Sequence, residues 1–431
     1  MLAEQQLANT RQRMAAIDTP NQVLGRTQSI GCVAVEITQK CNLDCTLCYL
    51  SENSQQVHDI PIEEVYRRLD DALEQFGAGT HVQITGGDPT LRKHSELVAI
   101  VRYARQLGLF PALFTNGIGA TRALLEQLAA AGLADVSFHV DTTQRRKGYG
   151  SENDLNDIRR EYLERAAGLG LMVIFNTTVH RDNFDELPQL IRFFRDHADL
   201  IGLVSFNLQA ETGRGEWGSR AIEVSKTTVR RQIEIAADGA LPWDVVRVGH
   251  IKCHDYMPTL VCNGRIHAAI DSPDIFARLL EAAPSLGSDR HLSKAALIRA
   301  YGTAFLTHPG TWWPALRYFS GLLKRMGGDY VRSRGRVHQL TFFIQNFMDA
   351  NSLDHERIDT CSFMVMTADG PVSMCEHNAN RDQYILKPLE VKSASGGVIH
   401  YVPLDEVKRG LKRAAALPAS NPTLQSSAEA L

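Results

Sequence analysis

Hydrophobic residues recur with two alternating periods between residues 32 and 209. Short β-rich runs alternate with amphipathic stretches of helical period. Six strands joined by five helices predict a parallel βα sheet, because parallel neighbours need a crossover connection, usually a helix. The predicted strands are 33–37, 81–85, 110–115, 135–140, 171–177 and 203–208, and the predicted helices are 61–76, 95–108, 121–131, 154–168 and 184–197.

The alternation stops near residue 209, which divides the chain into four segments. We expect a helical or loose leader over 1–30, a βα core over 31–210 and a second region of mixed α and β structure over 211–405. A tail over 406–431, rich in Pro, Ser, Asn and Gln towards its end, is expected to be mostly disordered.

Composition adds mainly exclusions. The 431 residues carry 46 Lys plus Arg against 49 Asp plus Glu, so no excess of positive charge favours nucleic acid. Residues 1–28 have no apolar signal-like core, and no apolar run reaches the length of a membrane span. We therefore expect a cytoplasmic protein without a transmembrane segment, in which eight cysteines serve metal binding or catalysis rather than disulfides.

Three cysteines follow the first predicted strand on one short loop. Cys41, Cys45 and Cys48 have the spacing C-x3-C-x2-C. Three thiolates can hold three irons of a [4Fe–4S] cluster and leave the fourth iron open to a small molecule. A structural zinc site is the alternative, but it takes four ligands, and no second cysteine pair or nearby His completes this one.

The cysteine loop, with Leu47 before its last cysteine, resembles the signature of the radical S-adenosylmethionine (SAM) enzymes. The resemblance covers roughly residues 32–209 and implies a partial (β/α)6 barrel with a C-terminal α+β extension. It also implies that SAM binds the open iron. One electron, from a reductant such as flavodoxin or ferredoxin, would then cleave SAM to methionine and a 5′-deoxyadenosyl radical that abstracts hydrogen from a substrate.

Ligands of parallel βα folds bind at the carboxyl ends of the strands, where this chain has polar residues. The second strand ends in Gly86, Gly87, Asp88 and Pro89, which is similar to the family turn whose backbone receives the SAM amino group. The family resemblance also implies a ribose contact for Asp141 and a SAM contact for Asn176. Further candidates for cofactor binding are Asn116 and Gln209, and His139 is the candidate proton donor.

Each of these candidates also has a structural interpretation. Asn, Asp and Thr at strand ends can simply cap the following helices, and a His at a strand end is more often a hydrogen-bonded core residue. Arg214, in a Gly-rich turn, could bind the SAM carboxylate, although a solvated loop charge is favoured.

Four cysteines of the second region form another candidate site: Cys253, Cys262, Cys361 and Cys375. A tight turn at Asp369 and Gly370 is expected to place Cys375 opposite Met364 on a hairpin, with Cys361 too far away for a disulfide. The arrangement is similar to the auxiliary-cluster extensions of radical SAM enzymes, which implies a closed second [4Fe–4S] cluster. The alternative is four unconnected buried cysteines, as we expect for Cys32.

The substrate is left open by the sequence. Residues 347–378 resemble radical SAM enzymes that act on unactivated carbon, such as tetraether lipid synthases and pterin-precursor methyltransferases, and imply C–C bond formation or methylation. A peptide or cofactor maturase is the alternative, so the substrate could be a small molecule, a lipid or a peptide. A non-catalytic iron–sulfur protein and a zinc-binding interaction protein are the alternatives outside the enzymes. For the aromatic, basic stretch 311–325 we favour an ordinary packed helix over a lipid-facing one.

Overall fold

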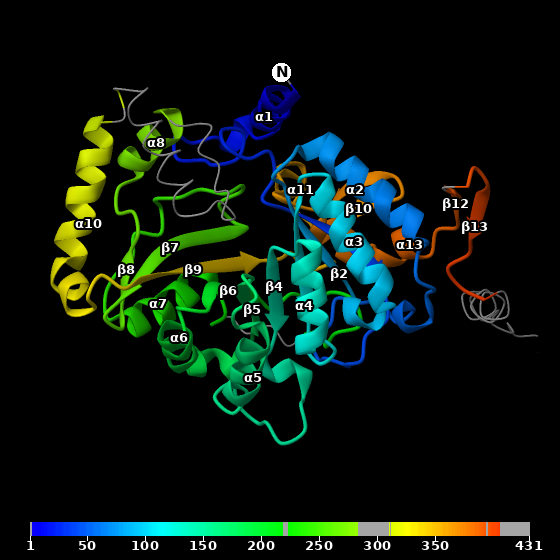
Figure 1. Cartoon of the computed structure of the whole chain (residues 1–431), viewed down its shortest axis with the longest axis horizontal. Helices are drawn as coiled ribbons and strands as arrows, with labels where there is room; N and C mark the ends of the chain where they lie inside the picture. The colour runs from blue at the N-terminus through cyan, green and yellow to red at the C-terminus, as the bar shows by residue number, and fades with distance from the viewer. Residues whose placement is uncertain (1, 219–222, 283–309, 311, 394, 406–431) are drawn as a thin grey trace, which may run out of the picture.

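The computed structural model describes residues 2–218, 223–282, 310, 312–393 and 395–405 (Figure 1). The predicted tail over 406–431 lies outside these residues. The leader forms helix α1 (Leu2–Arg13), and residues beyond it run along the body, where Gln22 pairs with Arg247. No helix among the described residues combines the length and the hydrophobicity needed to cross a membrane.

The first half of the chain folds into the six predicted βα units. All six strands and all five helices lie within a few residues of their expected positions, so the predicted fold class is confirmed. The strands are β1 (Cys32–Thr38), β2 (His81–Gly86), β3 (Phe110–Thr115), β4 (Asp135–His139), β5 (Met172–Val179) and β6 (Ile201–Leu208). The helices are α2 (Ile62–Phe76), α3 (His94–Gln106), α4 (Arg122–Ala131), α5 (Asn156–Ala166) and α6 (Leu187–Asp196).

Two strands of the second region extend the same sheet at both of its edges. β9 (Val337–Asn346) pairs in parallel with β6, and β10 (Phe363–Thr367) pairs in parallel with β1. Antiparallel β11 (Gly370–Ser373) and the pair β7 (His254–Cys262) and β8 (Arg265–Ala268) complete the order β11-β10-β1-β2-β3-β4-β5-β6-β9-β7-β8. Among the described residues this sheet is not closed, and the boundary near residue 210 is not a boundary of the sheet.

The remaining elements surround this sheet or lie at its periphery (Figure 1). α8 and the long α10 lie near the β7–β8 end, whereas the two-stranded sheet of β12 and β13 lies at the opposite side of the molecule. These elements are α7 (Lys226–Ala237), α8 (Pro273–Ala282), α10 (Trp312–Arg332), α11 (His355–Asp359), α12 (Met374–Ala379), α13 (Arg381–Ile385), β12 (Leu389–Lys392) and β13 (Val398–Tyr401).

Side chains alternate along the parallel strands between an apolar outer face and an inner face that mixes polar and apolar residues. In β2, Val82 and Ile84 are fully buried in the core, whereas Gln83 and Thr85 line the interior of the barrel. Successive side chains of a strand point to opposite faces, so each strand serves both surfaces. The apolar core therefore holds the barrel together from outside, and the inner face is left for a ligand.

Candidate active site

The three cysteines of the first loop line a cavity at the carboxyl end of the parallel strands. Backbone hydrogen bonds hold the loop on two sides. Thr46 N donates to Thr143 O over 3.0 Å, and Gly215 N donates to Cys48 O over 3.0 Å. Cys41, Cys45 and Cys48 are all partly accessible and unpaired by disulfides. The loop is thus fixed by its neighbours while its thiols remain available.

The segment around Arg214 packs on this loop. Arg214 N donates to Leu50 O over 2.8 Å, and its guanidinium donates to Leu43 O over 3.3 Å. Only 10% of the Arg214 side chain is exposed, so the favoured interpretation as a solvated loop charge is wrong. Arg214 holds the cysteine loop.

Burial is the largest cause that raises the pKa of the Cys45 thiol, and Asp141 and the other two thiols raise it further. Three thiolates this close to one another and to a carboxylate repel. A cationic iron cluster would relieve that repulsion, because coordination deprotonates thiols outright.

The Gly86–Pro89 turn lies directly against the cysteine loop. Gly87 N donates to Thr38 O over 2.9 Å, and Asp88 N donates to Lys40 O over 2.7 Å. A Cβ at Gly87 would lie 2.0 Å from Lys40 O, and one at Gly86 would lie 1.9 Å from Thr38 O. Both glycines are required for the packing of the two segments, before any contact with SAM is considered.

Asp88 has a different role from the one expected. Its carboxylate is fully buried and accepts hydrogen bonds from Thr90 N, Thr115 Oγ1 and Asn116 N. Neither Asp88 nor the buried Pro89 lines the cavity. Asp88 therefore ties the turn to the end of β3 and positions the cavity wall.

Four other predicted residues face the cavity, namely Gly87, Asn116, His139 and Asn176. Asn116 lies beside the cysteine loop, where its Nδ2 donates to Asn42 Oδ1 over 2.6 Å and approaches Cys41 Sγ at 3.9 Å. Asn116 and Asn176 thus offer amide groups beside the cysteines and deeper in the barrel.

Asp141 and Gln209 are not among the residues that line the cavity, so their assignment as cofactor ligands stays a prediction. The Asp141 carboxylate is completely buried, and it accepts from Thr178 N over 2.7 Å and from Thr143 N over 3.1 Å. Gln209 is also buried, and its backbone N donates to Val179 O. The capping alternative holds for Asp141, because its side chain begins the short helix that follows β4.

His139 and Asp141 form a pair, with 2.6 Å between His139 Nε2 and Asp141 Oδ2. Burial lowers the pKa of His139, but the Asp141 carboxylate outweighs it and leaves that pKa raised. Burial likewise raises the pKa of Asp141, whereas His139 and the hydrogen-bond donors lower it overall. The pair therefore favours a protonated imidazole beside an ionised carboxylate at the cavity wall.

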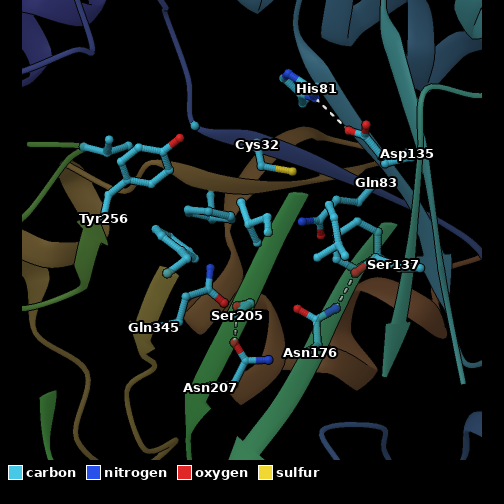
Figure 2. Close-up of a pocket in the computed structure, with 18 of the residues that line it drawn as sticks. Cys32, His81, Gln83, Asp135, Ser137, Asn176, Ser205, Asn207, Tyr256 and Gln345 are labelled. Carbon is cyan, nitrogen blue, oxygen red and sulfur yellow. Dashed lines mark hydrogen bonds and ion pairs between the residues drawn. The ribbon is translucent and has the colours of Figure 1, made fainter. Parts of the chain in front are cut away.

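The cavity measures about 1350 Å³ and runs through the barrel interior (Figure 2). The polar residues predicted from the strand ends are only part of the polar lining of this cavity. Several strands also contribute amide or hydroxyl side chains along their length. Polar residues at every second position of a strand would have indicated which side chains face the interior. The additional residues are Gln83, Ser137, Ser205, Asn207, Tyr256 and Gln345.

Three of the four cysteines in the second region come together. Burial raises the pKa of Cys375 to about 12, and the neighbouring Cys361 and Cys253 thiols contribute to that shift. Arg357 Nε donates to Cys253 Sγ over 3.2 Å, and Met348 N donates to Cys375 Sγ over 3.5 Å. Such N–H donors to sulfur are a feature of iron–sulfur sites.

The three thiols lie at the seam where β9 and β10 face each other without pairing. The ring centroids of Phe343 on β9 and Phe363 on β10 are 5.7 Å apart. The ring centroid of His254, the residue after Cys253, lies 4.8 Å from that of Phe363. Cys361 donates its thiol hydrogen to Phe363 O over 3.0 Å. Side chains rather than a hydrogen-bond ladder therefore join the two edges of the parallel sheet here.

Cys262 does not join this group, so the predicted set of four is not assembled. It ends β7, whereas Cys253 precedes that strand, and nine residues of extended chain span roughly 30 Å. Its thiol lies 3.3 Å from Ser333 Oγ instead. The hairpin also turns one residue earlier than expected: Met364 pairs with Ser373, and Cys375 lies on α12.

A buried ion pair joins the second region to the first strand. Arg381 donates to the Glu36 carboxylate over 2.8 Å and stacks over the Tyr49 ring, whose hydroxyl donates to Gly86 O. Burial alone would raise the pKa of Glu36, but Arg381 and His377 lower it to about 2. Arg381 thus supports both the cysteine loop and the glycine turn.

Among the described residues, no three His, Cys, Asp or Glu side chains are already gathered as ligands of one metal ion. The two cysteine groups nevertheless fit iron–sulfur clusters, because a cubane cluster holds its thiolates further apart than one ion does. Their free thiols, the N–H donors and the adjoining cavity all agree with this chemistry.

Residues 35–194 match the model of the Radical SAM superfamily. The chain is 27% identical over 186 residues to a 7,8-dihydro-6-hydroxymethylpterin dimethyltransferase of Methanocaldococcus jannaschii, covering 42% of this chain and 36% of that protein. It is 32% identical over 169 residues to a PqqA peptide cyclase of Methylobacterium nodulans, covering 38% of this chain and 42% of the cyclase. The chain thus spans less than half the length of these relatives.

Solved structures show a more distant likeness. SuiB of Streptococcus suis bound to its precursor peptide SuiA has a TM-score of 0.39 and 18% identity, covering 53% of this chain and 49% of SuiB. Methylornithine synthase (PylB) has a TM-score of 0.38 and 14% identity, covering 56% of this chain and 69% of the synthase.

Proposed function

We propose that this protein binds a [4Fe–4S] cluster through Cys41, Cys45 and Cys48 and cleaves SAM reductively. Such a cluster, when bound, passes one electron from a reductant of the flavodoxin or ferredoxin type to SAM. The C5′–S bond breaks to give methionine and a 5′-deoxyadenosyl radical, which takes a hydrogen atom from the substrate. The observation that carries the proposal is that the cysteine loop and Gly87 meet at one cavity within the part of the chain that matches the Radical SAM superfamily.

The residues of the chain then have distinct roles. Gly86 and Gly87 allow the two loops to pack, and Asp88 fixes the glycine turn to β3. Asn116 offers its amide beside the cysteines. His139, held by Asp141, presents a protonated imidazole to a carboxylate or another acceptor in the cavity. The neutral amides and hydroxyls deeper inside orient the substrate through hydrogen bonds.

We further propose that Cys253, Cys361 and Cys375 hold a second [4Fe–4S] cluster. Support comes from three thiols around one seam, of which Cys253 and Cys361 are buried, and from the donors Arg357 and Met348. With three thiolates in place of the expected four, this cluster has one iron without a cysteine ligand. Cys375 also lines the cavity, so a cluster held there would lie near the substrate space.

The reaction on the substrate is proposed as C–C bond formation or methylation at an unactivated carbon. The large interior favours a substrate bigger than SAM alone, because a pocket for a typical small ligand rarely exceeds about 1,000 Å³. Peptide modification is the second candidate, supported by the relatives that are named PqqA peptide cyclases.

The test is anaerobic reconstitution followed by iron and sulfide analysis and product detection. We expect about eight irons per chain and release of 5′-deoxyadenosine from SAM with dithionite. The variant Cys45→Ala should abolish 5′-deoxyadenosine formation. The matched control is Cys262→Ala, since Cys262 lies beside Ser333 and away from both groups, and it should retain both iron and activity.

Tightly held zinc without iron would contradict the enzyme proposal. Iron near four per chain with normal 5′-deoxyadenosine release would remove the second cluster and leave the first intact.

A further inference from the structure

Helix α10 exposes several large apolar side chains and buries its one acidic residue. Phe319 and Leu323 are 62% and 65% exposed, and Trp313 is 63% exposed. Asp329, in contrast, is buried and receives a hydrogen bond from Asn263 Nδ2 over 3.0 Å. Arg325 pairs with Asp271 and donates to Ala269 O on the same side. Polar contacts thus fasten the helix to the β8 region, and its apolar side faces outward.

The exposed residues form one stripe along the helix. Trp312, Leu316, Phe319 and Leu323 are three or four positions apart, which places them on one helical face. The helix packs on α8, β7 and β8, as expected for an ordinary packed helix, but this stripe remains largely exposed. An amphipathic helix normally turns such a face inward, so the exposure of Leu316, Phe319 and Leu323 leaves a surface on which an external partner can bind.

The charges beside the stripe are uniform in sign. From residue 312 to residue 336, every exposed charged side chain is cationic, because the single acid is the buried Asp329. The nearby α8 carries the exposed acids Asp274 and Glu281 with Arg278, so the cationic strip belongs to α10 and its continuation. Its members are Arg317, Lys324, Arg332, Arg334 and Arg336.

The cavity opens beside this face. Trp312, Leu316 and Phe319 line it together with Phe276 and Leu279 of α8. The same cavity reaches Cys41 and Cys45 at the carboxyl end of the barrel strands. The cavity therefore runs from an apolar end beside α10, through the polar barrel interior, to the place proposed for SAM cleavage.

We propose that α10 docks this protein on an anionic lipid bilayer, and that the adjoining mouth admits the apolar chain of a lipid substrate. Exposed Trp, Phe and Leu beside Arg and Lys are the features of a helix that lies in a membrane interface. A protein partner would satisfy the apolar stripe equally well, but the one-signed charge favours an anionic surface. The docking part stands alone, whereas the substrate part rests on the proposed function.

The docking test is co-sedimentation of the reconstituted full-length protein with vesicles. We expect binding to phosphatidylcholine vesicles containing phosphatidylglycerol, and weak binding to pure phosphatidylcholine or at high salt. Trp313→Ser/Leu323→Ser should reduce binding at least about tenfold. Arg317→Gln/Lys324→Gln should reduce it about 25-fold, because each cation near the surface changes affinity about fivefold.

The matched control is Ile235→Ser/Val398→Ser, which removes two other exposed apolar side chains and should leave binding unchanged. Trp313 and Leu323 do not line the cavity, so 5′-deoxyadenosine release without vesicles should be normal in the first variant. That readout separates a failure of docking from a failure of SAM cleavage. The proposal would be overturned if the wild-type protein did not bind anionic vesicles. It would also be overturned if the Trp313→Ser/Leu323→Ser variant bound them as strongly as wild type. If the wild-type protein did not bind vesicles but formed a dimer, and the variant were a monomer, the exposed face would instead be the interface with a second copy of the chain.

The proposed entrance of the cavity, lined by Trp312, Leu316 and Phe319, is tested with a dansyl-labelled fatty acid as the probe. We expect fluorescence enhancement on binding, and at least about a tenfold loss of affinity for Leu316→Glu, because it puts an unpaired charge at an apolar entrance. Leu323→Glu, further along the stripe, should bind the probe as wild type does. Equal binding by wild type and Leu316→Glu would overturn the entry route while leaving docking intact.

Discussion

The two cysteine groups of this protein are built in opposite ways. Cys41, Cys45 and Cys48 lie within eight residues on one loop, partly exposed at the cavity. Cys253, Cys361 and Cys375 come from three separate elements and meet at the seam between β9 and β10. A local loop can keep one iron accessible, whereas a site assembled from distant segments also fastens those segments together.

The difference matters for function because metal binding at an assembled site is coupled to folding. The first group should govern chemistry with little effect on the fold. The second should govern both the seam and whatever happens to the substrate after the radical forms.

The largest expected effect comes from the first group. Replacing Cys41, Cys45 and Cys48 by Ala should abolish 5′-deoxyadenosine formation and remove about half of the iron. The fold should persist, because the loop is held by backbone hydrogen bonds from Thr46 and Gly215. Product analysis, iron assay and circular dichroism check this, and a triple variant that still cleaved SAM would contradict the assignment.

The double variant Cys361→Ala/Cys375→Ala should also lose about half of the iron, yet still produce 5′-deoxyadenosine. We expect a lower melting temperature than for the triple variant, because the seam loses its cross-link. A double variant that kept all its iron would mean that these thiols are ordinary buried cysteines.

The buried ion pair between Glu36 and Arg381 offers a third test. Arg381→Met leaves the buried Glu36 carboxylate without its guanidinium partner, although the Gln39 amide still donates to it, and this should lower the free energy of unfolding by about 3–5 kcal/mol. Glu36→Gln/Arg381→Met should recover much of that loss. Denaturant unfolding checks both, with Arg160→Met, from an exposed pair with Asp157, as a control that should change stability by less than about 1 kcal/mol.

The Glu36–Arg381 pair also makes the stability of the folded protein depend on pH. The pKa of Glu36 is lowered from 4.5 to about 2 in the folded protein, so its stabilisation is present above pH 4.5 and is lost as the pH falls towards 2. The stability difference between wild type and Arg381→Met should shrink over that window. A difference independent of pH would show that Arg381 acts through packing on Tyr49 instead.

Cys262→Ser is expected to have the smallest effect on iron content and activity. It tests whether the second cluster has three cysteine ligands or four. The thiol is buried beside Ser333 and away from the other cysteines. Iron content and 5′-deoxyadenosine yield should both equal those of wild type. Loss of about half of the iron would restore the four-cysteine site.

The sequence by itself determined the βα core, because the periods of its hydrophobic residues are local and each element is stabilised by its own apolar face. It also determined the first cysteine group and the Gly86–Pro89 turn, since spacing within one loop and the end of one strand can be read directly. It could not predict that β9 and β10 join the two edges of the core sheet, because neither belongs to the βα alternation.

Only the tertiary structure decided which distant residues meet. It separated Cys262 from Cys253 by the length of β7, buried the carboxylates of Asp88 and Asp141 in hydrogen bonds to neighbouring backbone, and turned the apolar face of α10 outward. Each outcome depends on strand register or on a partner far away in sequence. The residue types set the chemistry that is possible, and long-range pairing selects the residues that can carry it out.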